Sequence, residues 1–103
     1  MEDEGELVET VTAARKILVS YDANGRRRRE CTLVNQFVFG RAVVVRLKER
    51  RKRYEYPGLI SRKGVERLGQ SVFIMRKKDA EDFTHLLRKL RVPFREEVVW
   101  VRF

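Results

Sequence analysis

Several short segments of the chain have the apolar pattern of β-strands. The runs at 15–21 and 71–76 are rich in β-branched and aromatic residues, which favour strands. Residues 95–103 alternate around Val98 and Trp100 with the two-residue period of a half-buried strand. These segments therefore predict three strands.

Other segments have a helical period. Acidic residues followed by apolar ones at helical spacing predict a helix over 4–15. Residues 80–91 place apolar side chains at positions i, i+3, i+4 and i+7, which predicts a core-facing helix with Asp79 as its N-cap. A shorter helix is expected over 62–68, with Ser61 as its N-cap.

The centre of the chain reads as extended structure. Asn24-Gly25 predicts a tight hairpin turn, since both residues tolerate positive φ. The returning strand would begin with the arginines of 26–29 and continue through 31–39 to a break at Gly40-Arg41.

Residues 42–49 contain three consecutive valines, which favours a strand over a helix. We expect a long strand that leaves the body of the protein as a basic arm, followed by a turn at Pro57-Gly58. A helix over 43–53 stays open as the alternative, because that stretch also contains good helix formers.

Together these elements predict one α+β domain over residues 1–103. Its antiparallel sheet has about four to five strands, with an N-terminal helix and a C-terminal helix packed on one side. With 43% hydrophobic residues the chain can bury a core, and no apolar run approaches the roughly 18 residues that cross a bilayer. The acidic first residues are unlike a secretory leader, so we expect a cytoplasmic protein with no membrane partner.

The charge is unevenly distributed. The chain has 24 Lys and Arg against 15 Asp and Glu, a net charge of +9, and 17 of the basic residues are arginine. Residues 26–53 contain eleven basic and two acidic residues, so this quarter of the chain contributes a net +9. Such concentration predicts a surface that binds a polyanion.

Candidate catalytic groups are few. The chain has one cysteine, Cys31, and one histidine, His85, and lacks the phosphate-binding and zinc-protease motifs. We therefore expect no enzyme, no cofactor and no metal site. A small nuclease is the least favoured alternative, either metal-dependent or with His85 beside Arg88 as a metal-free site.

Aromatic residues are interleaved with the basic ones. Unpaired nucleic acid exposes both phosphates and base faces, and proteins bind it with a positive groove and aromatic platforms. A duplex hides its bases, so this pattern favours single-stranded DNA or RNA bound with little sequence preference. The expected contact residues are Arg26, Arg27, Arg28, Arg29, Phe37, Phe39, Arg41, Arg46, Lys48, Arg50, Arg51, Lys52, Arg53, Tyr54 and Tyr56.

Some assignments stay open. Phe37 and Phe39 fit either the core or the binding site, and Trp100 fits the core, a subunit interface or the site. The alternative function is an adaptor or subunit that docks on a structured RNA or an acidic protein. A homo-oligomer is expected, with a dimer favoured, because a small domain with several strands leaves an edge to cover.

The layout resembles a family of thermophilic archaeal proteins that bind single-stranded DNA, called ThermoDBP, and especially its short related members. The resemblance rests on the N-terminal helix, on Arg26–Arg29 and Arg41–Arg53, and on the terminal unit from residue 71 through 86–90 to 98–101. It implies a fold other than the OB-fold, a cleft of hydrophobic and basic residues that holds bases, and oligomers that bind single-stranded DNA and unpaired RNA. The C-terminal zipper helix of the longer member of that family has no counterpart here, so assembly would use another surface. The charged fraction of 38%, with two Asn and two Gln, also resembles thermophile usage.

Overall fold

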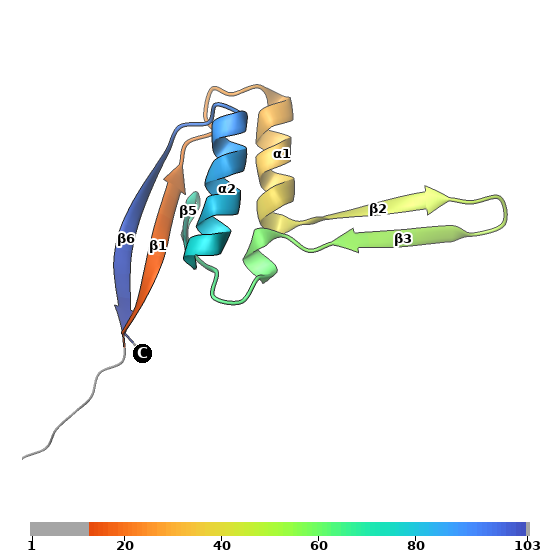
Figure 1. The fold of residues 1–103 in the computed structure, drawn as a ribbon. Helices are drawn as coiled ribbons and strands as arrows, with labels where there is room; N and C mark the ends of the chain where they lie inside the picture. Colours follow the sequence, from red (N-terminus) through yellow and green to blue (C-terminus); the bar gives the residue numbers. More distant parts are fainter. Residues whose placement is uncertain (1–12, 103) are drawn as a thin grey trace, which may run out of the picture.

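The computed structural model describes residues 13–102, which form a four-stranded antiparallel sheet covered on one face by two helices (Figure 1). Along the chain, residues 41–56 follow the first helix and form a separate two-stranded hairpin that projects from the body, which we call the arm. A short 3-10 turn comes after it. The elements in chain order are β1 (Ala13–Tyr21), α1 (Arg28–Phe39), β2 (Arg41–Arg46), β3 (Arg51–Tyr56), η1 (Leu59–Ser61), β4 (Glu66–Gly69), β5 (Val72–Met75), α2 (Lys77–Lys89) and β6 (Phe94–Arg102).

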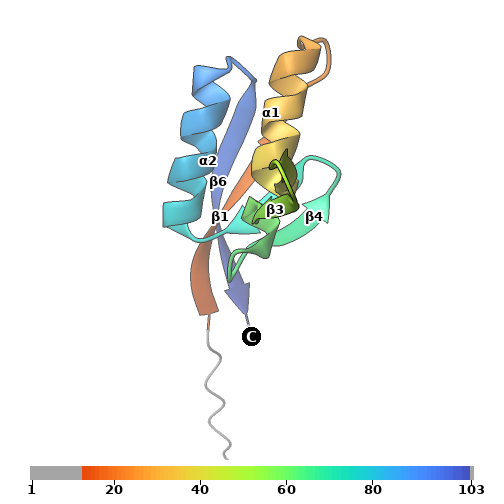
Figure 2. The same cartoon turned by 90° about the vertical axis from the view of Figure 1, so that its right-hand side faces the viewer.

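The sheet has the strand order β4-β5-β1-β6, and every neighbouring pair is antiparallel. With the arm set aside, the elements follow the order β-α-β-β-α-β, which is the split βαβ arrangement. Figure 2 looks along the arm toward the body and shows α1 and α2 side by side in front of the sheet. The arm is therefore an insertion between α1 and the second strand of the sheet.

The core lies between the sheet and the two helices. In β1, side chains at every second position point toward the helices, and in β5 Phe73 and Met75 do the same. Phe83 packs edge-on against Phe73, with ring centres 6.3 Å apart, so α2 is fixed against the sheet by aromatic contact. The buried apolar residues of this cluster are Ile17, Val19, Val34, Val38, Leu59, Phe73, Met75, Ala80, Phe83, Leu87 and Val92.

Part of the predicted framework is confirmed. The domain is α+β with an antiparallel sheet, and strands occupy most of 15–21, 71–76 and 95–103. The helix predicted over 80–91 spans Lys77–Lys89 and presents its apolar stripe to the core. Asp79 is not its N-cap, because the helix begins earlier and Asp79 lies in its first turn.

The predicted hairpin at Asn24-Gly25 is wrong, because the chain turns there into helix α1. The Asn24 amide donates to the Asp22 carboxylate over 2.9 Å, and Gly25 has φ +78°. The arginines of 26–29 therefore lead into a helix instead of opening a strand. The Arg27 amide donates to the Glu30 carboxylate over 2.9 Å, as in a capping box.

Residues 31–39 are likewise helical, not extended. Val34 and Val38 are four residues apart, and both are buried against the core. Their spacing fits a helical face, and burial of that face outweighs the strand propensity of valine and phenylalanine.

The sequence also predicts two further helices. Most of the helix expected over 4–15 lies outside the described residues, and residues 13–15 belong to β1. The helix expected over 62–68 is wrong, since a 3-10 turn at Leu59–Ser61 precedes a strand at Glu66–Gly69. Of the two helices in the described chain, only α2 was predicted.

The basic arm is extended as predicted, but it is a hairpin of two strands and not one long strand, and the alternative helix over 43–53 is wrong. β2 and β3 pair antiparallel from Arg41–Tyr56 at the root to Arg46–Arg51 near the tip, where residues 47–50 form the turn. The Leu47 amide closes this turn by donating to the Arg50 carbonyl over 2.7 Å.

At the root of the arm, Gly40 and Gly58 meet with no room for a side chain. Gly40 ends α1 with φ +85°, and its amide donates to the Gln36 carbonyl over 2.9 Å. Gly58 is buried, and a Cβ placed on it would overlap the backbone of Gly40, Val38 and Phe39. The missing side chains let both strands of the arm join the body beside the end of α1.

We expect Gly58→Ala to lower the free energy of unfolding by about 1–3 kcal/mol, because the added methyl group forces backbone apart. Urea unfolding followed by circular dichroism measures the change. Gly69→Ala is the matched control, since its Cβ would meet Val72 at 3.7 Å, an ordinary contact, and should change stability by about 0.5 kcal/mol or less. Equal effects of the two substitutions would contradict this account of the root.

Candidate nucleic-acid interface

The arm has two chemically different faces, because side chains alternate across a strand and directly opposed residues share a face. All of its residues are exposed, and residues 41–56 carry seven basic and two acidic side chains, a net charge of +5. One face carries Arg41, Val43, Val45, Lys52, Tyr54 and Tyr56, and the other carries Ala42, Val44, Arg46, Arg51, Arg53 and Glu55.

On the first face, which we call the tyrosine face, each phenol ring is paired with a cation. The guanidinium carbon of Arg41 lies 4.9 Å from the centre of the Tyr56 ring, and the Lys52 ammonium lies 5.1 Å from that of Tyr54. Tyr54 is 41% exposed and Tyr56 is 48% exposed. Cation–π contacts hold such rings in place and leave much of their surface open to solvent.

The second face, which we call the arginine face, concentrates positive charge. Arg46 and Arg51 lie directly opposite each other near the tip, where like charges destabilise the strand pair. Arg53 donates to the Glu55 carboxylate over 3.0 Å, an exposed ion pair that contributes little to stability. With Lys48 and Arg50 exposed in the turn, this end of the arm can contact several phosphates.

The tyrosine face continues into a hollow of about 360 Å³ where the arm meets the body. Arg41 and Tyr56 belong to both surfaces, so the hollow extends the arm's aromatic and basic lining onto α1. It is lined by Leu33, Gln36, Phe37, Arg41, Tyr56, Pro57, Arg62 and Leu86.

Phe37 forms part of the hollow's floor and is half-buried. Its ring stacks on that of Phe83, with centres 5.6 Å apart, and the Arg62 guanidinium carbon lies 5.7 Å from its centre. One side of Phe37 therefore packs in the core, and another side lines the hollow. The structure shows the contact of Phe37 with the core, and its role in binding stays a prediction.

Arg62 is held in place by acidic residues of α2. Its Nη1 atom donates to Asp82 over 2.9 Å and to Asp79 over 3.1 Å, and Asp79 is buried. The hydrogen bond to Asp82 raises the pKa of Arg62; partial burial opposes this, and the bond to Asp79 adds to it. The guanidinium of Arg62 is thus a fixed positive charge beside the root of the arm.

The four arginines of 26–29 are exposed, but the structure does not bring them together with the arm. They lie at the start of α1, whereas the arm leaves its far end (Figure 1). A helix of twelve residues is about 18 Å long. The two arginine clusters therefore form separate basic surfaces instead of lining one groove.

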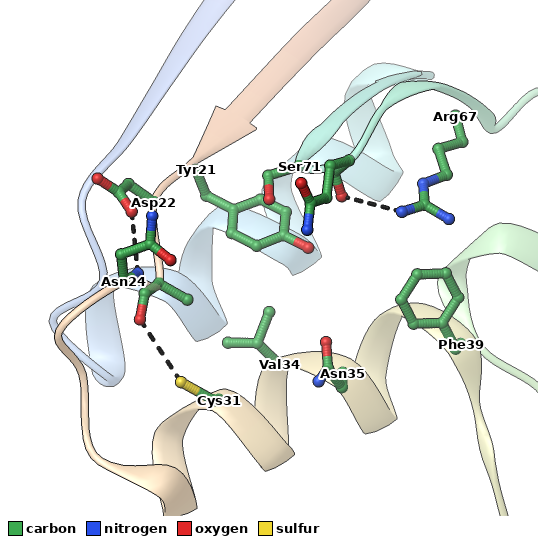
Figure 3. Close-up of a pocket in the computed structure, with 11 residues that line it drawn as sticks. Tyr21, Asp22, Asn24, Cys31, Val34, Asn35, Phe39, Arg67 and Ser71 are labelled. Atoms are coloured by element: carbon green, nitrogen blue, oxygen red, sulfur yellow. Dashed lines mark hydrogen bonds between the residues drawn. The ribbon is translucent and has the colours of Figure 1, made fainter.

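A second hollow, of about 450 Å³, lies between α1 and the turn joining β4 to β5 (Figure 3). Phe39, at the end of α1, is 45% exposed here, and the Arg67 guanidinium carbon lies 5.2 Å from its ring centre. Arg67 is fixed by donating to the carbonyls of Gly69 and Gln70. The other lining residues are Tyr21, Asp22, Ala23, Asn24, Cys31, Val34, Asn35 and Ser71.

The polar lining of this second hollow can hydrogen-bond a ligand. Burial raises the pKa of Tyr21, opposed by its hydrogen bond to Ser71 and by the charge of Arg67, so the phenol stays protonated at neutral pH. The Cys31 thiol donates to the Ala23 carbonyl over 3.5 Å, and Cys31 is only partly buried. Within residues 13–102, no three His, Cys, Asp or Glu side chains are arranged to hold a metal ion.

Sequence reasoning missed Arg62 and Arg67, the two cations that lie over Phe37 and Phe39. Each is flanked by ordinary surface residues, and no local motif distinguishes it. Both come from the segment after the arm, whose structure was predicted wrongly. Their role becomes visible only when that segment is folded back against α1.

Comparison of the chain with protein-family models, with curated proteins and with solved structures gives no match. The resemblance to ThermoDBP therefore stays a prediction. In the part of the chain that the structure describes, no helix is both long and apolar enough to cross a membrane.

Proposed function

We propose that this protein binds unpaired nucleic acid, DNA or RNA, with little sequence preference, and that the arm is its main contact surface. The observation that carries the proposal is the tyrosine face: two exposed rings, each beside a cation, on one side of a projecting basic ribbon. Bases stack on such rings whatever their sequence, and each stacked base contributes about 1–3 kcal/mol.

The charge of the arm supports the same proposal. Its arginine face and turn carry basic side chains that phosphates can contact, and Arg41 and Lys52 place two further cations beside the rings of the tyrosine face. Guanidinium groups make forked contacts with phosphate, and arginine is the main basic residue here. Neutralised phosphates release counterions, so binding of this kind depends strongly on salt.

The hollow at the root extends this surface. A base that leaves the end of the tyrosine face would meet Phe37 beneath the guanidinium of Arg62. Arg26–Arg29, about one helix length away, would contact a more distant part of the same strand. We propose no catalytic step for this surface.

A second candidate is docking on a structured RNA or an acidic protein. An isolated two-stranded hairpin is marginally stable in water, so an arm of this shape gains order when it lies against a partner. Tight binding to a folded RNA or a protein, with weak binding to oligo-dT, would favour this candidate.

We expect affinity for oligo-dT to fall with salt, with a log–log slope near −4 if about six phosphates are contacted, at roughly −0.7 per contact. The double variant Arg51→Ala/Arg53→Ala should make the slope shallower by about 1.4, because two contacts are lost. Fluorescence anisotropy titrations at several salt concentrations measure both slopes.

The matched control is Lys89→Ala/Arg95→Ala, which removes the same charge from exposed positions of the body rather than the arm. It should leave the slope nearly unchanged. A flat salt response of the natural protein, or equal effects of the two double variants, would contradict the proposed role of the arm.

We expect Tyr54→Ala to weaken oligo-dT binding by about 5- to 150-fold, because one stacking platform is lost. The salt slope should not change, since no phosphate contact is removed. Tyr54→Phe keeps the ring and should retain most of the affinity. The same titrations separate the variants, and a Tyr54→Ala protein that binds normally would show that bases do not lie on this face.

A further inference from the structure

Among residues 13–102, strand β6 leaves one long edge of the sheet open. It is the last strand in the order β4-β5-β1-β6, and within residues 13–102 it pairs only with β1. It runs for nine residues without a bulge, and its stretch Val98–Val101 has no charge. Natural proteins usually protect such edges with short strands, charges, proline or bulges, because exposed backbone groups pair readily with another strand.

The same stretch carries apolar side chains that the fold leaves exposed. Trp100 is 69% exposed and Val98 is 49% exposed, and both lie on the helix side of the sheet. On the opposite side, Val99 and Val101 are half-buried. Trp100 lies opposite Arg15, toward the end of the β1–β6 ribbon. An indole this exposed is costly to hydrate and is a frequent anchor of protein interfaces.

We propose that β6 pairs antiparallel with β6 of a second copy of the chain, which joins the two sheets into one of eight strands. Opposed residues must share a face, and this condition restricts the register. A two-fold axis beside Val99 places Val98 opposite Trp100 of the second copy. The same register places Glu96 opposite Arg102, so opposite charges meet at both ends of the pairing.

Two-fold pairing within one sheet keeps both helical layers on the same face. Both arms then leave the dimer from that face, because each arm extends from the helix side of its own body (Figure 1). If the arms bind nucleic acid as proposed above, one dimer could hold one strand at two points and gain affinity through local concentration. The dimer itself depends only on β6 and not on that function.

Trp100 is the only tryptophan, so its fluorescence reports on this interface directly. We expect emission to shift to longer wavelength as the protein is diluted and the indole becomes exposed to water. Over the same concentrations, light scattering should show a change from about twice 12.3 kDa to a single chain of 12.3 kDa. A 12.3 kDa species at every concentration would overturn the proposal.

Crosslinking tests the register. The natural cysteine is first removed by Cys31→Ser. In the proposed register the two copies of residue 99 lie opposite each other across the axis, with Cα atoms about 4.5–5.5 Å apart, so the cysteines of a Val99→Cys variant can form a disulfide. Oxidation should therefore give a covalent dimer. The matched control Val101→Cys lies four residues from its copy, about 13 Å away, and should not crosslink. Equal crosslinking of both variants, or of neither, would overturn the proposed pairing.

Trp100→Glu should give a monomer, because two added charges enter the apolar contact. Its oligo-dT affinity should fall for long strands that span both arms and stay unchanged for short strands that occupy one arm. Failure of the proposed function would look different: the natural protein would still crosslink and dimerise but would not bind oligo-dT.

Discussion

The close approach of Gly40 and Gly58 is the constraint on which the rest of the site depends. Neither position has space for a Cβ, so the chain leaves α1 and returns to η1 at nearly the same place. That crossing fixes the direction of the arm and brings Tyr56 and Arg41 beside the hollow that contains Phe37 and Arg62. The arm's strands have no core of their own, so their relation to the body rests on this backbone contact.

The arm lowers the stability of the folded protein. Arg46 and Arg51 repel each other across the strand pair, and three valines and two tyrosines stay exposed in a hairpin without a hydrophobic core. The stability of the domain comes instead from the cluster around Phe73 and Phe83, which does not include the arm. A polyanion would offset this repulsion, and bases would cover the rings. An arm whose only role was to keep the protein in solution would not explain this loss of stability.

The sequence predicted those elements whose pattern is local. The apolar stripe of α2, the strands β1, β5 and β6, and the extended character of the arm were predicted, but the turn at residues 47–50 that divides the arm into two strands was not. Helix α1 was missed because Asn24-Gly25 is a strong hairpin signal, which outweighed the cap that Glu30 forms by accepting from the Arg27 amide. Tyr54 and Tyr56 are exposed, as predicted, but the separation of Arg26–Arg29 from the arm follows from the length of α1, which the sequence did not predict. The placement of Arg62 and Arg67 over phenylalanine rings depends on long-range folding and could not be read from composition.

The most direct test of this account is a competition between unpaired and paired strands of the same sequence for the natural protein. Labelled oligo-dT is displaced by oligo-rU, by unlabelled oligo-dT or by a dT·dA duplex at two salt concentrations. If bases stack on the tyrosine face, the unpaired strands should compete at least several-fold better than the duplex, and the difference should persist at the higher salt. A duplex that competes equally well at both concentrations would show that the arm recognises phosphate charge alone, and would contradict the claim that its rings accept bases.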